Sequence, residues 1–169
     1  MRGIVLGNGP SKIYYNFRDR TEDIAIGCNI SGKDYKVDKS VISDTEIVWV
    51  LKNYLNLVSV PIIISSIALD KMKELHIDHY YEVEHIFKLK EWYNAAHYAT
   101  EYLIAKGCDK IDIYGCDSIF EDTIASSTDE HVEKTTELQD KFLTHWREIW
   151  RNIFDSNRKV SFNVIQLKV

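Results

Sequence analysis

The chain has 169 residues, 45% of them hydrophobic and 12% aromatic, which is enough to bury the core of one domain. Its formal net charge of −5 at pH 7 argues against nonspecific binding to nucleic acid or to an anionic membrane, because both attract a basic surface. Since no run reaches the roughly 20 apolar residues that cross a bilayer, and no signal peptide precedes the first apolar run, we expect a cytoplasmic protein without a transmembrane segment.

The first half of the chain contains short, continuous apolar runs that are rich in β-branched residues and bounded by polar ones. Runs of this kind are typical of strands in a parallel sheet that helices cover on both faces. Four strands are predicted, in chain order at residues 3–7, 23–29, 45–52 and 60–66. After them Leu69, Met72 and Leu75 indicate a short helix, and residues 80–87 look like a strand that carries charges.

The second half contains the clearest helices. Gly107 is a natural C-terminal stop for residues 91–107, whose apolar stripe consists of Trp92, Ala96, Ala99 and Leu103. A buried-looking strand follows at 110–115.

The last third of the chain is predicted to form a long amphipathic helix and a final strand. Residues 127–130, "STDE", fit a capping box that would begin a helix over 129–154, and a strand is expected at 159–167. Along this helix the apolar residues recur every three or four positions, at Leu138, Phe142, Trp146, Ile149 and Ile153. The alternation of strands and helices predicts an α/β domain with helices layered on a mostly parallel sheet of five to seven strands.

The histidines in the middle of the chain raise the question of a metal site. His76, His79 and His85 stand among several carboxylates, and both kinds of group bind divalent ions. Their spacing is not a recognised ligand set, so a polar surface segment is the favoured interpretation and no metal site is predicted. The three cysteines form no CxxC pair and are odd in number, which favours free thiols over a zinc site or a disulfide framework.

Polar residues follow several of the predicted strands, beyond whose carboxyl ends a parallel sheet binds its ligands. Asparagine side chains both donate and accept hydrogen bonds, which suits a phosphate, a ribose or a base edge, although asparagine is also common in turns. The candidate nucleotide-binding residues are Gly7, Asn8, Gly9, Pro10 and Ser11 after the first strand, Asn29 after the second, Asn53 after the third, and Gly115 and Asp117 after the strand at 110–115.

The opening loop, "GNGPS", departs from both common phosphate-binding motifs. It lacks the lysine of a Walker loop and the third glycine of the dinucleotide fingerprint, which disfavours an ATPase or an NAD dehydrogenase.

Three segments together resemble a known family. They are "IVLGNGPS", the later "CN" with an asparagine after the third predicted strand, and "NAAHYATEYLIAKGCDKIDIYGCDSIF". With these segments the chain resembles the bacterial sialyltransferases of the Campylobacter lipooligosaccharide type, together with the related motility accessory proteins and archaeal pterin pyrophosphokinase-like proteins. The resemblance implies a single Rossmann-like nucleotide-binding domain over residues 1–169. A shortened relative of this kind would be consistent with a phage or mobile-element source.

The resemblance also implies roles for the residues at the strand ends. Asn8, with the amides of Gly9 and Ser11, would hold the phosphate end of a cytidine nucleotide. By the same resemblance Asn29 and Asn53 would contact the nucleotide sugar and its phosphate, and Asp117 would form the floor of the crevice. The family needs no metal cofactor and inverts the anomeric centre, with a histidine as general base.

His131 is the candidate for that base. If the capping box is correct, it lies in the first turn of the last helix, where the helix dipole disfavours imidazolium and leaves the neutral ring that a base requires. The alternative is an exposed histidine at a helix start.

The chain departs from the sialyltransferases at one place. Where they have threonine-serine-glycine, this chain has Asn94-Ala95-Ala96, without the hydroxyl groups.

Three functions follow from these features. The first is a glycosyltransferase-like protein that binds a nucleotide-sugar donor, with CMP as a candidate nucleotide, and transfers the sugar to a hydroxyl of a carbohydrate acceptor. The second is a nucleotide or nucleotide-sugar binding protein without the chemistry. The third is a pterin-type pyrophosphokinase, which would depend on ATP and Mg²⁺. No nucleic-acid partner is expected, and a homo-oligomer is compatible with all three.

Overall fold

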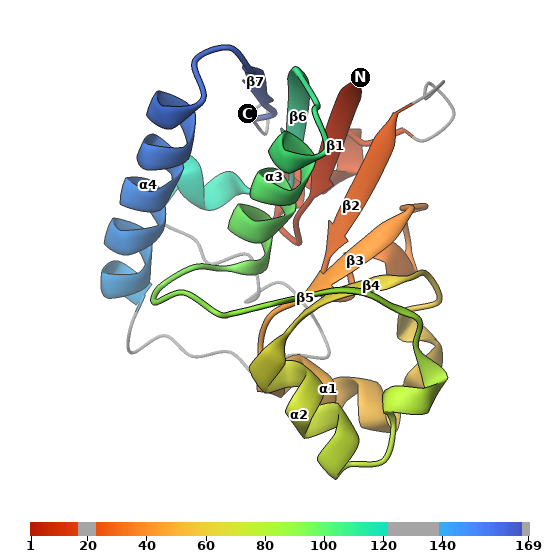
Figure 1. Ribbon diagram of the computed structural model, residues 1–169. Coiled ribbons are helices and arrows are strands. Elements are labelled where there is room, and N and C mark those ends of the chain that lie inside the picture. The colour runs from red at the N-terminus through yellow and green to blue at the C-terminus, as the bar shows by residue number, and fades with distance from the viewer. Residues whose placement is uncertain (17–22, 122–138, 167–169) are drawn as a thin grey trace.

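Seven parallel strands form one sheet, in the order β5-β4-β3-β2-β1-β6-β7 (Figure 1). The computed structural model describes residues 1–16, 23–121 and 139–166, with the side chains of the last helix described from residue 142 onward. The strands are β1 (Arg2–Leu6), β2 (Ile24–Cys28), β3 (Lys39–Ile42), β4 (Ile62–Ser65), β5 (Val83–Phe87), β6 (Lys110–Tyr114) and β7 (Ser161–Val164), and the α-helices are α1 (Thr45–Asn53), α2 (Ser66–Glu74), α3 (Ala95–Ala105) and α4 (Gln139–Ser156). The predicted α/β fold with a mostly parallel sheet is therefore confirmed.

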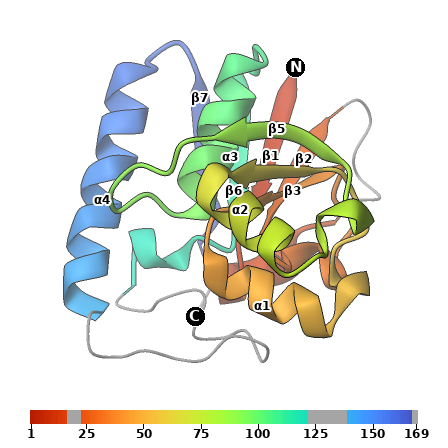
Figure 2. The same ribbon diagram turned by 60° about the horizontal axis from the view of Figure 1, so that its bottom comes forward.

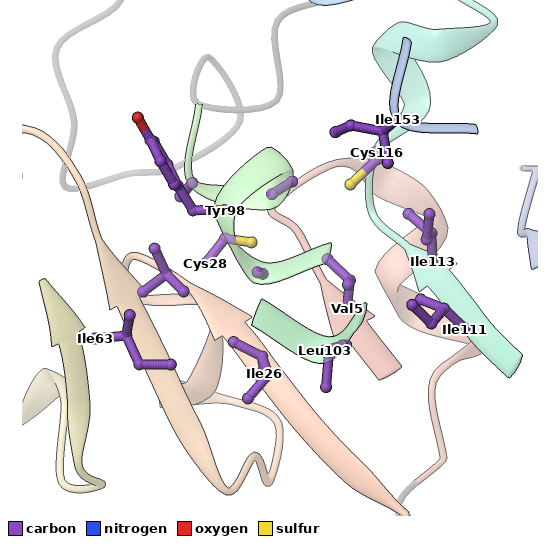
Figure 3. Packing of buried hydrophobic residues seen from close by; sticks show 14 of the residues in the cluster. Val5, Ile26, Cys28, Ile63, Tyr98, Leu103, Ile111, Ile113, Cys116 and Ile153 are labelled. Carbon is purple, nitrogen blue, oxygen red and sulfur yellow. The ribbon is translucent and has the colours of Figure 1, made fainter. Parts of the chain in front are cut away.

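Helices cover both faces of the sheet. Alternate residues of each strand point to opposite faces, so each face has its own set of apolar side chains to bury. On one face Val5, Ile26 and Ile63 pack with residues of α3 and α4 (Figure 3). On the other face Ile62 and Ile64, the neighbours of Ile63 in β4, pack with residues of α1 and α2. The result is the three-layer, Rossmann-like arrangement, with buried strands that read as continuous apolar runs.

The order in which strands are added to the sheet changes direction next to β1. From β1 the sheet grows through β2, β3, β4 and β5 on one side, and through β6 and β7 on the other. In open parallel sheets the loops at such a reversal diverge and leave room for a ligand beyond the carboxyl ends of the strands. The loops after β1, β2 and β6 and the beginning of α3 meet at this edge, which Figure 2 turns toward the viewer.

One predicted strand is a helix. Residues 45–52 belong to α1, and the neighbouring strand is β3, a four-residue segment that sequence reasoning missed. Ile47, Val48 and Leu51 are buried on one side of α1, at the spacing of a helix rather than of a strand. Asn53 therefore does not follow a strand: it ends α1, where its Nδ2 donates to the Trp49 carbonyl at 3.4 Å on the exposed surface. Its expected place at a strand end is wrong.

The other predicted elements within the described residues are confirmed with shifted ends. The helix expected at 91–107 begins at Ala95, and Gly107 follows it with a φ of +91°. The short helix near Leu69 is α2, and the last helix extends to Ser156. The capping box at 127–130 and His131 lie outside the described residues. The strand expected at 159–167 is shorter at both ends, since β7 begins at Ser161 and ends at Val164. No helix in the part of the chain that the structure describes is long and apolar enough to cross a membrane.

Candidate functional site

The loops after β1 and β6 lie backbone against backbone. The Gly7 amide donates to the Tyr114 carbonyl at 2.8 Å, and the Gly9 amide donates to the Gly115 carbonyl at 2.7 Å. A Cβ atom on Gly7 would lie 2.5 Å from the Gly115 carbonyl oxygen, and one on Gly115 would lie 2.5 Å from that of Gly7. Gly115 also has a φ of +71°, which favours glycine. These glycines are thus required for loop packing.

Ser11 and Asp117 fasten the same two loops. One carboxylate oxygen of Asp117, Oδ2, accepts from the Ser11 amide at 3.1 Å and from the Ser11 hydroxyl at 3.0 Å. The Ser11 hydroxyl in turn accepts from the Gly115 amide at 2.8 Å. The amides of Gly9 and Ser11, which the resemblance assigned to a phosphate, are engaged within the protein. Pro10 begins the short 3-10 helix η1 (Pro10–Tyr14) behind them.

The two asparagines beyond β1 and β2 have different environments. Asn8 is 6% exposed, and its Nδ2 donates to the Cys28 carbonyl at 3.3 Å, which joins the first loop to the end of β2. Asn29 adopts the left-handed conformation, with a φ of +55°. Its Oδ1 is buried and has no hydrogen-bond partner among the described residues. Asn29 is therefore the asparagine whose side chain retains binding capacity.

A cavity of about 100 Å³ lies beyond the ends of β1, β2 and β6, against α3 and α4. It adjoins a wider pocket of about 690 Å³ between the start of α1, the loop before α3, and α4. Asp44, Asn94 and Trp146 line both, and we call the two together the crevice. The residues that line the smaller cavity are Gly7, Asn8, Cys28, Asn29, Asp44, Asn94, Ala95, Ala96, Gly115, Cys116, Ser118, Trp146 and Trp150.

Buried polar atoms without a partner gather around the crevice. In the described ranges six such side-chain atoms occur, and three of them, Asn29 Oδ1, Ser43 Oγ and Trp150 Nε1, belong to residues on its walls. One more, on Asp117, belongs to a residue whose chain neighbours Cys116 and Ser118 line the smaller cavity. Each unpaired buried polar atom costs about 1–3 kcal/mol, so their concentration at one edge indicates a site that a polar ligand or water completes.

The N-terminus of α3 offers two backbone donors to the smaller cavity. Asn94 and His97 form a capping box, in which Asn94 Oδ1 accepts from the His97 amide at 3.1 Å and His97 Nδ1 accepts from the Asn94 amide at 3.0 Å. The first amides of a helix have no intrahelical acceptor. Those of Ala95 and Ala96 find none in the residues that the structure describes, and both residues line the cavity. A helix N-terminus with free amides favours an anion.

We expect Asn94→Ala to lower the free energy of unfolding by about 1 kcal/mol, because the first turn of α3 loses its side-chain cap. Asn94→Asp keeps an acceptor oxygen at the same place and is the matched control. Urea unfolding at pH 7 measures both variants, and an Asn94→Ala protein as stable as the Asp variant would contradict the importance of this cap.

The wider pocket has aromatic and charged walls. The ring of Trp92 stacks on His145 with centroids 4.2 Å apart and meets the edge of Phe142 at 5.5 Å, and Phe142 in turn lies 5.6 Å from Trp146. The charged residues on these walls are Asp44, Glu46, Lys90 and Glu91. An aromatic wall beside polar groups suits a ligand with a flat or partly apolar surface, such as a base or a sugar ring.

The structure brings some predicted site residues together and separates others. Gly7, Asn8, Asn29 and Gly115 line the smaller cavity. Gly9, Pro10, Ser11 and Asp117 lie behind that lining as its support, Asn53 is at the far end of α1, and His131 is outside the described residues.

Sequence reasoning missed Asp44, the α3 amides and Trp150. The signal for two of them was present, since Asn94 stands three residues before His97 and Asp44 directly precedes α1, both at N-cap positions.

The structure also bears on the histidines and cysteines that the sequence raised as metal ligands or disulfides. Within the described part of the chain no group of three or more histidine, cysteine and carboxylate side chains is placed to hold a metal ion. Cys28, Cys108 and Cys116 are all free and buried, as predicted for free thiols. Cys28 and Cys116 line the smaller cavity, but burial raises the pKa of Cys28 to about 12 and that of Cys116 well above its usual value, so both stay protonated at neutral pH.

Comparison of the sequence with family models, with curated proteins and with solved structures finds no match. Function is therefore inferred from the crevice itself.

Proposed function

We propose that the crevice binds a nucleotide-sugar and that the protein is a glycosyltransferase that transfers the sugar to an acceptor hydroxyl. The observation that carries this proposal concerns polar groups that have no partner among the described residues. Buried side-chain atoms and helix amides of this kind converge on one crevice at the reversal point of a parallel sheet. Such a site has donors for an anion and acceptors for hydroxyl groups, which are the two kinds of polar group on a nucleotide-sugar.

A phosphate fits the smaller cavity by hydrogen bonding to backbone amides. The amides of Ala95 and Ala96 supply donors, and the dipole of α3 favours a negative group at its N-terminus. The adjoining pocket of about 690 Å³ has room for the base or the sugar, with Trp92 and Trp146 as stacking surfaces. The resemblance to the sialyltransferases makes CMP the first nucleotide to examine.

Two alternative functions would give different experimental results. A protein that kept the crevice and lost the chemistry would be stabilised by a nucleotide-sugar without consuming it. A pterin-type pyrophosphokinase would instead require ATP and Mg²⁺. The free amides in the crevice serve a phosphate in any of these cases, so ligand identity and turnover distinguish them.

A thermal-shift panel of CMP, CDP, UDP, GDP, ATP and their sugars tests the binding. A ligand that binds only the folded protein raises its Tm, and we expect at least one nucleotide-sugar to do so. If none of them stabilises the protein, the proposal fails.

Ala95→Pro tests the place of the phosphate. Proline at the first position of a helix deletes one amide donor and preserves the helix, and Asn94, with φ −106° and ψ 175°, already has the extended conformation that a following proline requires. Since a hydrogen bond to a charged group contributes about 1.5–3 kcal/mol, we expect affinity to fall about 10- to 100-fold.

The matched control is Ser66→Pro, at the first position of α2 and off the crevice lining. The Ser66→Pro protein should bind the ligand with the affinity of the wild-type protein. Equal affinity of the Ala95→Pro and wild-type proteins would place the phosphate elsewhere.

A further inference from the structure

Asp44 holds the N-cap position of α1 but does not cap the helix. Its backbone is extended, with φ −102° and ψ 146°, and its side chain accepts no hydrogen bond from the first turn. An aspartate at this position ordinarily accepts from the second or third amide of the helix. In the described ranges the carboxylate has no hydrogen bond and no ion pair, and Asp44 lines both the smaller cavity and the wider pocket.

The carboxylate is reachable from solvent and yet poorly hydrated. Asp44 is exposed at the surface of the crevice, but protein surrounds it on most sides, and this desolvation raises its pKa above the ordinary 3.8. The other charged groups on the walls are Glu46 on α1 and Lys90 and Glu91 on the loop before α3. An unpaired carboxylate in such a place has the basicity and the access that proton transfer requires.

We propose that Asp44 is the general base of the glycosyl transfer, a role that rests on the proposed function. The Asp44 carboxylate takes the proton of the acceptor hydroxyl while that oxygen forms a bond to the anomeric carbon of the donor. The bond from the anomeric carbon to the phosphate oxygen breaks, and its electron pair leaves with the nucleotide. The protonated Asp44 then returns its proton to water.

The α3 amides and Asp44 divide this step between two elements. The amides of Ala95 and Ala96 stabilise the negative charge that grows on the departing phosphate, and Asp44, from the β3–α1 junction, removes the proton. Because both groups line the same cavity of about 100 Å³, the reacting centre lies between them. This places the base within the described residues, whereas the sequence had placed it at His131.

The first test is turnover of CMP-linked sialic acid and of the nucleotide-sugar that stabilises the protein most. We expect Asp44→Asn to bind the donor with unchanged affinity and to release nucleotide at least about 100-fold more slowly. In the wild-type protein the rate should fall with acid below the raised pKa of Asp44, and this acid limb should be absent from the residual rate of the variant.

Asp70→Asn, on the exposed side of α2, is the matched control and should keep the wild-type rate and profile. His131→Ala should retain most of the turnover. If His131→Ala abolishes turnover and Asp44→Asn retains it, the role of Asp44 is overturned, as it also is if Asp44→Asn abolishes donor binding.

A second readout needs no ligand. Because the folded pKa of Asp44 is raised, its ionisation disfavours the folded state, so the stability it contributes is present at low pH and is lost as the pH rises through the folded pKa. Asp44→Asn should therefore have a higher Tm than the wild-type protein at pH 7, and the difference should vanish near pH 3. A lower Tm at pH 7 would show that the carboxylate has a structural role and overturn the inference.

The outcomes also separate this inference from the proposed function. A nucleotide-sugar that stabilises the wild-type protein but is never turned over supports the binding site and overturns a catalytic Asp44. If no nucleotide-sugar binds, the proposed function and the role of Asp44 fail together.

Discussion

Acidification from pH 7 to pH 3 is expected to lower the free energy of unfolding by about 4 kcal/mol through His97 alone. This residue is 0% exposed, and its burial lowers the pKa to about 3 from the ordinary 6.5, because the charged ring cannot be hydrated there. Each unit of difference between the folded and unfolded pKa corresponds to about 1.36 kcal/mol.

Stability decreases with acid because the proton binds the unfolded chain first. Between pH 6.5 and pH 3 the unfolded chain takes up a proton on this histidine and the folded chain does not. The stability is therefore complete above pH 6.5 and falls progressively as the pH decreases toward 3. Urea unfolding at intervals of one pH unit, followed by circular dichroism, measures the slope.

His97→Gln isolates this contribution. A glutamine oxygen can accept the Asn94 amide as His97 Nδ1 does, but the side chain takes up no proton in this range, so the pH dependence should flatten even though the variant is less stable at pH 7. The matched control is His85→Gln, on the exposed part of β5, which should keep the wild-type slope. A full slope in the His97 variant would assign the acid sensitivity to other groups.

His97 also connects acid sensitivity to the crevice. Its Nδ1 accepts from the Asn94 amide, so the neutral ring carries its proton on Nε2, and protonation of Nδ1 would abolish the capping box. The first turn of α3 would then lose one of its two reciprocal bonds, and the amides of Ala95 and Ala96 would be held less firmly. Because the folded protein protonates this ring only near pH 3, we expect ligand affinity to weaken only at that pH, below the range in which most of the stability is lost.

The sequence was sufficient for most of the fold, since long buried strands and amphipathic helices have distinct periods. It failed where a segment was short or ambiguous. Only four residues form β3, and its apolar part is Val41 and Ile42. In α1 the apolar residues Ile47, Val48 and Val50 run almost continuously, as they would in a buried strand, although the helix buries just one side.

The edge of the sheet that holds the candidate site could also be predicted, but not which atoms are free. Gly9 and Ser11 look like the donors of a phosphate loop until the loop around Gly115 and Asp117 is placed beside them. That contact joins residues more than 100 positions apart, which no local pattern encodes. The same holds for Asn8 and Asn29, which look equivalent in sequence, although within the described ranges the buried side-chain oxygen of Asn29 has no partner and the Asn8 side chain donates to Cys28.

Alanine at Gly7 or Gly115 is expected to destabilise the protein by about 3 kcal/mol or more, the second of the two largest effects. At either position the new Cβ would lie 2.5 Å from a backbone carbonyl oxygen, which cannot move aside as a flexible side chain can. Gly115→Ala has the additional cost of a φ of +71°, about 1 kcal/mol. Chemical denaturation gives both values, and losses this large occur only for a few mechanisms, of which backbone strain and overpacking apply here.

Gly107→Ala separates the two causes. Gly107 has a φ of +91°, but a Cβ there would meet nothing within 4 Å, so only the conformational cost of about 1 kcal/mol applies. The variant with alanine at both Gly7 and Gly115 should lose less than the combined single losses, because the first Cβ already pushes apart the two loops that the second would push. Additive losses would mean that each alanine strains only its own loop. The contact between Gly7 and Gly115 would then not be what holds the loops after β1 and β6 together as the wall of the crevice.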